Sequence, residues 1–249
     1  MTQAQGLDTL QKSNFTKTQF TYIYECILTN SVITRTLKET QLVRRTKEDA
    51  LATRHRLLDA AERLFLAKGV SNTSLQDIAR AAEATRGAVY WHFKDKADLF
   101  NAMMDRVTLP LEASLEFLAH AETAQPLAHI CSSIRQALLR IATDTQTRRV
   151  FEVATLKVEY IDELQAIRMR HVHVRNSFLE KIESGLRAAA LAELIVLRVP
   201  AAIAAQGLHA MLDGLIQNWL LDNAAFDLVE VGEHVVAVYL TGLGLLPKV

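Results

Sequence analysis

Residues 73–96 read TSLQDIARAAEATRGAVYWHFKDK, and this stretch decides the fold. Thr73 is followed three residues later by Gln76, a capping-box spacing that predicts the start of a short helix. Thr85 is a suitable cap for a second short helix after a tight turn. Two such helices in succession form a helix-turn-helix, whose second helix enters the major groove of DNA. The stretch therefore predicts a DNA-binding protein.

The second helix of this pair is expected to expose the residues that touch DNA. Arg86, at its start, can donate two hydrogen bonds to a guanine edge, with Thr85 beside it. Gly87 has no side chain, so the helix can approach the duplex closely. Each residue alone is compatible with an ordinary surface role, whereas the ordered set favours DNA contact. The donors suited to phosphate oxygens, which fix register rather than sequence, are those of Thr73, Tyr90, His92 and Lys96.

A longer helix precedes this pair. Its apolar stripe has i, i+3, i+4 spacing, and Gly69 is a natural stop. Arg44 and Arg45 lie ahead of this helix, where they could reach a groove or phosphate; a solvated basic arm is equally compatible. The stripe consists of Leu57, Leu58, Ala61, Leu64 and Phe65.

The charge distribution agrees weakly with a DNA-binding head. The whole chain of 249 residues has a formal net charge of zero. Residues 44–98 hold 11 Lys and Arg against 8 Asp and Glu, whereas residues 99–249 hold 13 against 17. A basic N-terminal part followed by an acidic C-terminal part fits phosphate contact by residues 44–98 alone. The net charge of +3 on residues 44–98 is also compatible with an ordinary solvent-exposed face.

Beyond Phe100 the pattern predicts longer helices, and Pro110 is expected to bend or break the first of them. The last two, over about 200–221 and 227–243, are apolar nearly all round, so each must be covered on two faces. One cover is the chain's own core, and the other is expected to be the same helices of a second copy, in a two-fold homodimer. Complete burial within one monomer is the alternative.

The chain resembles the TetR family of transcriptional regulators, specifically over residues 44–100 and more weakly over 214–228. The weaker match is similar to the multidrug-efflux repressor subgroup. The resemblance implies an all-α homodimer, with a three-helix DNA-binding domain at 43–93 and a helical ligand-binding and dimerisation domain at 94–249. It implies a repressor that binds double-stranded operator DNA and is released by a small hydrophobic effector. Residues 1–42 are expected to be a disordered extension or sequence that is not natively translated.

The ligand site is the least legible part of the sequence, because no motif marks it. We expect an apolar pocket with a few polar groups among the middle helices. A ligand there would shift the helix that follows Lys94, and so change the spacing of the two DNA-binding heads. The candidate lining residues are Phe151, Glu152, Met169, His173, Phe178, Gln217 and Trp219.

One residue departs from the family pattern. The family commonly has glycine in the turn between the two short helices, where this chain has Glu83. A glutamate in a turn that needs positive φ is strained, and its charge lies near the expected DNA surface. The turn geometry or the operator affinity is therefore expected to differ.

Other functional classes find less support. The sequence has no nucleophile-elbow, P-loop or zinc-protease motif, so an enzyme is not expected. Its two cysteines match no metal or redox spacing, and no metal or cofactor is expected. No apolar run is long enough to span a membrane, which favours a cytoplasmic protein. An architectural helix-turn-helix protein without an effector remains the alternative, although it would not need the long apolar C-terminal part.

Overall fold

The computed structural model describes residues 47–116, 125–159 and 165–245. The proposed extension over residues 1–42, together with Arg44 and Arg45, lies outside these ranges. The described residues form nine helices and no strand, which confirms the all-α prediction. The described residues fall into two units, one ending at Thr53 and the other beginning at Arg54, and the packing described below belongs to the second.

A helix over residues 47–68 packs, from Arg54 onward, against two short helices, α3 (Leu75–Ala81) and α4 (Arg86–His92). The predicted apolar stripe is confirmed: Leu57 and Phe65 are fully buried. They belong to one core with Ile78 of α3 and Val89 of α4. Gly69 ends the long helix as predicted, with φ of 83°. Burial of these apolar side chains is the main force that holds the three helices together.

The start of α3 lies one residue later than predicted. Its N-cap is Ser74, whose Oγ accepts from the Asp77 amide at 3.1 Å, while the Asp77 carboxylate accepts from the Ser74 amide at 3.3 Å. The prediction of a Thr73–Gln76 capping box was therefore wrong. Thr73 is 1% exposed, and its hydroxyl donates back to the Gly69 carbonyl at 2.8 Å, so it is not available to cap.

Six longer helices follow. The first is α5 (Lys96–Glu116), and the Asp95 carboxylate caps its start by accepting from the Asp98 amide at 2.8 Å. It continues through Pro110, so the helix does not break there, and the bend stays a prediction. The remaining helices are α6 (Pro126–Thr143), α7 (Thr145–Leu156), α8 (Gln165–Ala192), α9 (Ala201–Leu221) and α10 (Leu228–Gly242).

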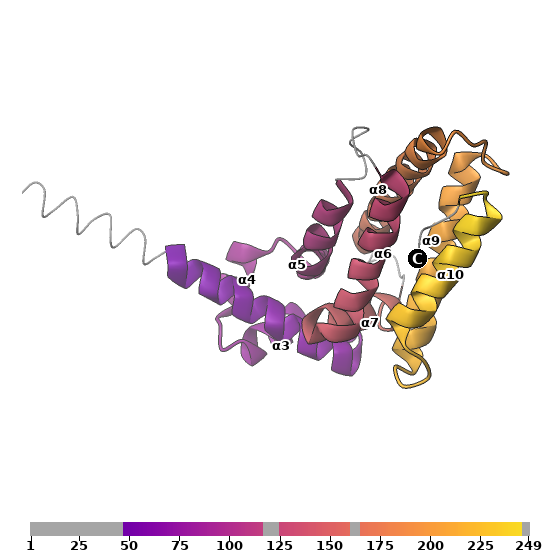
Figure 1. Ribbon diagram of the computed structural model, residues 1–249. Helices are drawn as coiled ribbons and strands as arrows, with labels where there is room; N and C mark the ends of the chain where they lie inside the picture. Colours follow the sequence, from indigo (N-terminus) through magenta and orange to yellow (C-terminus); the bar gives the residue numbers. More distant parts are fainter. Residues whose placement is uncertain (1–46, 117–124, 160–164, 246–249) are drawn as a thin grey trace, which may run out of the picture. The chain divides into compact units, whose positions relative to one another are not determined.

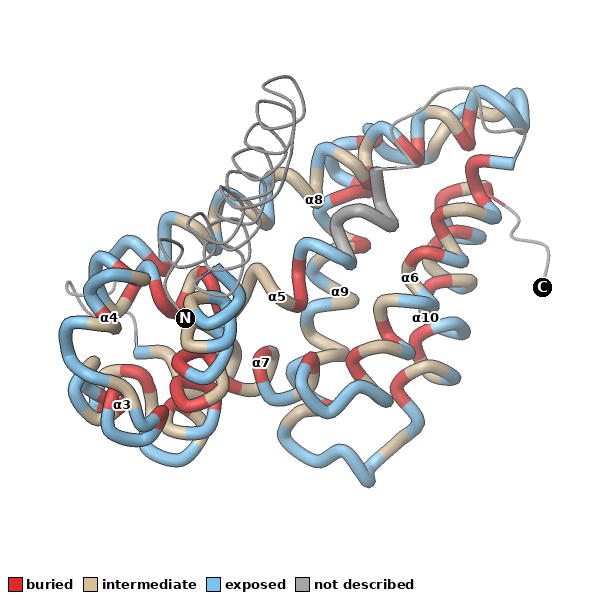
Figure 2. The backbone as a smooth tube through the Cα atoms, turned by 90° about the vertical axis from the view of Figure 1, so that its left-hand side faces the viewer, coloured by how far each residue is buried: buried red, intermediate tan, exposed pale blue. Residues whose placement is uncertain are grey.

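In the C-terminal half, α8 packs against α6 and α9, and α10 packs against the same two helices (Figure 1). Leu186, Leu208 and Leu240 meet in the core that these helices share. Figure 2 shows buried positions alternating with exposed ones along α6 and α10. The outer face of the terminal pair keeps apolar side chains in solvent, among them Ile203 of α9 and Val238 of α10. No helix among the described residues is long and apolar enough to cross a bilayer.

Candidate nucleic-acid interface and ligand cavity

The helix α4 presents a continuous exposed face. Its N-cap Thr85 accepts a hydrogen bond from the Ala88 amide at 3.1 Å, which fixes the first turn. Val89 and the C-cap Phe93 point inward and are buried. The opposite face carries Thr85, Arg86, Gly87, Tyr90 and Trp91, all of which are exposed.

Two features of this face suit contact with a duplex. The Arg86 guanidinium carbon lies 5.5 Å from the centre of the Tyr90 ring, one helical turn away, and such a cation–π contact restrains the side chain without using its hydrogen-bond donors. A Cβ added at Gly87 would meet only the Thr85 hydroxyl oxygen, at 3.9 Å. The surface at Gly87 is therefore open, and an approaching backbone would meet no side chain there.

The turn between α3 and α4 has the positive φ that is unfavourable for a residue other than glycine. Glu83 has φ of 52°, in the left-handed region. The Glu83 amide donates to the Arg80 carbonyl at 3.2 Å and the Ala84 amide to the Ala79 carbonyl at 2.9 Å. These two bonds form a Schellman motif, whose central position is usually glycine. The turn forms with glutamate in place, and its exposed carboxylate lies just ahead of α4.

Two of the predicted phosphate donors, Thr73 and Lys96, already donate to backbone carbonyls. Thr73 is buried with its hydroxyl proton already donated, so it is not available to a phosphate. The Lys96 ammonium donates to the carbonyls of Val70 at 3.0 Å and Ser71 at 3.2 Å, which ties α5 to the loop before α3. His92 is partly buried, and burial, followed by the charge of Arg54, lowers its pKa.

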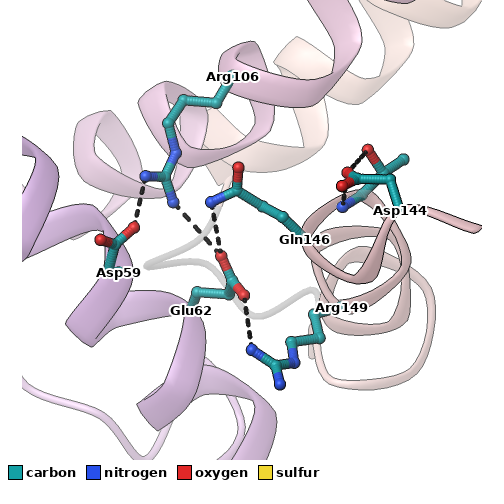
Figure 3. Close-up of polar contacts among 7 residues, drawn as sticks. Asp59, Glu62, Arg106, Asp144, Gln146 and Arg149 are labelled. Carbon is teal, nitrogen blue, oxygen red and sulfur yellow. Dashed lines mark hydrogen bonds and ion pairs between the residues drawn. The ribbon is translucent and has the colours of Figure 1, made fainter. Parts of the chain in front are cut away.

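A buried ionic cluster joins the helix of residues 47–68 to α5 and α7 (Figure 3). Glu62, 4% exposed, accepts from Arg106 of α5 at 3.4 Å and from Gln146 of α7 at 3.4 Å. Arg149 of α7 lies 3.7 Å from the other Glu62 oxygen, and Arg106 also pairs with Asp59 at 2.6 Å. Burial raises the Glu62 pKa, against the lowering effect of these partners.

A cavity of about 140 Å³ lies among α5, α7, α8 and α9. Its apolar wall includes Phe100 of α5, Phe151 of α7 and Phe178 of α8. Its polar lining consists of Asn101 and Thr108 of α5, Thr155 of α7, Arg170, His171 and Arg175 of α8, and His209 and Asp213 of α9. The described residues hold no cluster of His, Cys, Asp and Glu that could bind a metal ion.

Comparisons with known proteins agree with this arrangement. Residues 57–103 match the model of the bacterial regulatory proteins of the tetR family, and residues 125–244 match the C-terminal region of MAATS-type transcriptional repressors. The HTH-type transcriptional repressor BepR of Brucella suis is 34% identical, over 81% of this chain and 96% of BepR. The chain belongs to the TetR family.

Solved structures of TetR-family repressors have the same fold. NalD, the secondary repressor of the MexAB-OprM multidrug efflux pump in Pseudomonas aeruginosa, superposes with a TM-score of 0.72. It is 37% identical, over 78% of this chain and 98% of NalD. SmeT of Stenotrophomonas maltophilia in complex with triclosan gives a TM-score of 0.70 at 28% identity, over 80% of this chain and 98% of SmeT. Membership of the TetR family confirms a transcriptional regulator over the enzyme alternative.

Of the ligand residues that the sequence suggested, two line the cavity of this TetR-family chain: Phe151 and Phe178. Trp219 does not, because it is buried in a separate core with Leu138 and Leu228. The other four candidates also lie off the lining. Met169, His173 and Gln217 are exposed, and Glu152 is partly buried outside the cavity.

None of the polar lining, which comes from α5, α7, α8 and α9, was predicted from the sequence. Asn101, Met104 and Thr108 fall on one face of α5 at i, i+3 and i+7 spacing. Asn101 and Thr108 are polar residues beside the apolar Phe100 and Met103 of the same helix. This pattern in the sequence could have indicated a polar patch on the cavity wall. The lining residues of α9, His209 and Asp213, lie one turn apart and carry no comparable signal, because α9 has polar residues on other faces as well.

Proposed function

We propose that this chain is a ligand-responsive transcriptional repressor that binds operator DNA in the cytoplasm as a homodimer. The observation that carries the proposal is the exposed face of α4, with Arg86 and Gly87 beside each other on a helix held by Val89 and Phe93. In this proposal residues 43–93 bind DNA, and residues 94–249 bind the effector and pair the subunits. The functions named for NalD and SmeT favour a multidrug efflux or similar transport operon as the target.

The proposed dimer interface is the outer face of α9 and α10. Ile203 on α9 is 60% exposed and Val238 on α10 is 74% exposed. A second copy related by a two-fold axis would cover both helices with the same two helices, so that each apolar face is removed from water. Two heads held in this way would place their α4 helices in successive major grooves, about 34–36 Å apart.

The proposed route from effector to DNA runs through α5 and α7. Both helices line the cavity, α5 with Phe100 and α7 with Phe151, and both hold the buried Glu62 carboxylate through Arg106 and Arg149. An effector that moves either helix must also move or break the contacts to Glu62, which belongs to the helix packed behind α3 and α4. The effector acts only if it binds the DNA-free and DNA-bound conformations unequally.

The alternative is an architectural helix-turn-helix protein without an effector. The cavity favours the ligand-responsive function, because an architectural protein has no need of an apolar space with polar groups on its wall.

Footprinting on the DNA adjacent to the chain's own gene tests the proposal. The purified protein is expected to protect a pseudo-palindromic site, and a panel of hydrophobic compounds should include some that abolish protection. Protection that no compound relieves would favour the architectural alternative. Absence of any protected site at low salt would contradict the proposal.

A further inference from the structure

The loop between the long first helix and α3, residues 69–72, is tied to two other helices. The Val70 amide donates to the carbonyl of Lys157, the C-cap residue of α7, at 3.1 Å. The Lys96 ammonium donates to the Val70 carbonyl at 3.0 Å and to the Ser71 carbonyl at 3.2 Å. Because Lys96 is the first residue of α5, the loop is held by α5 and by α7 at once.

The same loop fixes the start of α3. The buried Thr73 hydroxyl donates to the Gly69 carbonyl at 2.8 Å, which closes the loop against the end of the long first helix. The next residue, Ser74, is the N-cap of α3. Val70 is fully buried in the core that also contains Ile78 of α3. A displacement of this loop would therefore displace α3, together with α4, which packs against α3.

The charge of Lys96 is used within the protein. A lysine at the first position of a helix is unfavourable, because the N-terminal end of the helix dipole is positive. Two carbonyls compensate the ammonium of Lys96, and hydrogen bonds from a charged donor are stronger than those between neutral groups. An ammonium has three donors, so two are already used, and the side chain is half-buried. Lys96 is thus poorly placed to bind a phosphate.

We propose that Lys96 is a positioning residue for DNA recognition: it holds the loop of residues 69–72 and so keeps α3 and α4 in the orientation that the operator requires. A lysine on a phosphate strengthens binding to any duplex, because phosphate contacts carry no sequence information. A lysine that orients α4 acts on the contacts to base edges and therefore on the operator above all. The inference rests on the proposed function only in treating α4 as the helix that reads the operator.

Lys96→Met separates these two roles, because it keeps most of the side chain and removes its charge and donors. Affinity for the operator should fall at least about tenfold, since base contacts depend on the orientation of α4. Affinity for a random duplex of the same length should change less than about twofold. Titrations of both duplexes by fluorescence anisotropy measure these affinities.

The salt dependence of binding to the random duplex counts phosphate contacts. The logarithm of the binding constant falls with the logarithm of the salt concentration, by about 0.9 for each contact. The slope is expected to be the same for Lys96→Met and for the wild type. Loss of one phosphate contact from each subunit of a dimer would reduce it by about 1.8.

Hydrogen exchange in the free protein tests the loop itself. In Lys96→Met the Val70 amide should exchange at least about tenfold faster than in the wild type, while amides of α9 and α10 keep their rates. Lys94→Met is the matched control, because Lys94 is exposed and lies two residues earlier, ahead of α5. It removes the same charge, and it should change neither the Val70 exchange rate nor the ratio of operator affinity to random-duplex affinity.

Acetylation of lysines in the wild type tests the inference even if Lys96→Met does not fold. Lys96 should react at least about fivefold more slowly than Lys94, because its ammonium is bound, and random duplex should not slow it further. A smaller salt slope or equal losses on both duplexes for Lys96→Met would overturn the inference. So would unchanged Val70 exchange, or strong protection of Lys96 by random duplex. A wild-type chain that binds no DNA would instead contradict the proposed function, since the exchange measurement needs no DNA.

Discussion

Glu83 has a strained backbone conformation, and its negative charge lies close to the face that is proposed to bind DNA. Its φ of 52° is one that side chains with a Cβ adopt at a steric cost. Its carboxylate is exposed in the turn ahead of the face that is proposed to meet phosphates. The motif forms nevertheless, because burial of Ile78 and Val89 on either side of the turn holds α3 and α4 in place.

Replacing Glu83 by glycine is expected to raise the free energy of unfolding by about 1 kcal/mol, because the left-handed strain is relieved. Operator affinity should also rise, since a negative charge is removed. Denaturant unfolding and fluorescence anisotropy measure the two effects. Leu194→Gly is the control: Leu194 has φ of 53° and is exposed at the end of α8. It should stabilise similarly without any gain in DNA affinity; an equal gain in DNA affinity would contradict the electrostatic argument.

A substitution at Gly87 is expected to have opposite effects on the stability of the protein and on its affinity for DNA. A Cβ at this position meets open space, so Gly87→Ala should stabilise the helical conformation by about 0.5–1 kcal/mol. The same methyl group would stand between α4 and the duplex, and operator affinity should fall by tenfold or more. Thermal unfolding and gel-shift titration of the same preparation measure the two quantities. Unchanged operator affinity would show that α4 does not approach DNA through this position.

At the scale of elements, the contact between α9 and α10 depends on the small size of Gly207. A Cβ there would collide with the Tyr239 hydroxyl, which donates to the Ala204 carbonyl at 2.9 Å. The close approach therefore both packs the two helices and satisfies a partly buried hydroxyl. Since these helices also carry the proposed dimer face, their mutual packing shapes that face.

Gly207→Ala is expected to destabilise the protein by about 1–3 kcal/mol, because the new methyl group overpacks the contact. Gly214→Ala, on the same helix, has no atom near its added Cβ and should be neutral or stabilising by up to about 1 kcal/mol. Urea unfolding compares the two. Analytical ultracentrifugation should show a weaker dimer for Gly207→Ala alone, and equal behaviour of both variants would contradict this account of the α9–α10 contact.

At the scale of the whole molecule, the Glu62 cluster connects the proposed functions. In this cluster, Asp59 and Glu62 of the long first helix contact one residue of α5 and two of α7 (Figure 3). A buried carboxylate with three partners tolerates little displacement, because separation from any partner leaves a charge poorly compensated. In the proposed route, small movements of α5 or α7 are therefore transmitted to the helix behind α3 and α4.

Glu62→Gln preserves shape and a hydrogen bond to Gln146 while removing the ionic contacts to Arg106 and Arg149. Effector and operator should each still bind, but the effector should reduce operator affinity at least about fivefold less than in the wild type, a loss of about 1 kcal/mol of coupling. Operator titrations with and without effector give this ratio. Glu183→Gln, which removes an exposed ion pair with Arg187 within α8, should keep full coupling. Full coupling in Glu62→Gln would contradict the proposed route.

The fold was largely predictable because its signals are local. Apolar periodicity located the buried face of the long first helix and, by exclusion, the exposed face of α4. The predicted N-cap of α3 was wrong by one residue, because the hydroxyl groups of Thr73 and Ser74 can both cap a helix. Only the burial of Thr73 in the folded protein decides between them. The cavity was poorly predicted because four helices distant in sequence contribute to it, and no local spacing marks which face of each helix meets the others.

The most direct test of the account compares the affinity of Arg86→Ala with that of the wild type, on operator and on random duplex of the same length. Arg86 is exposed and its guanidinium packs on the exposed Tyr90, so its loss should leave the fold intact, and Arg187→Ala on α8 serves as the control. The account predicts a loss of about 1–3 kcal/mol per subunit on the operator and a much smaller loss on random DNA. Equal losses on the two duplexes, or none on the operator, would contradict the claim that α4 reads the major groove.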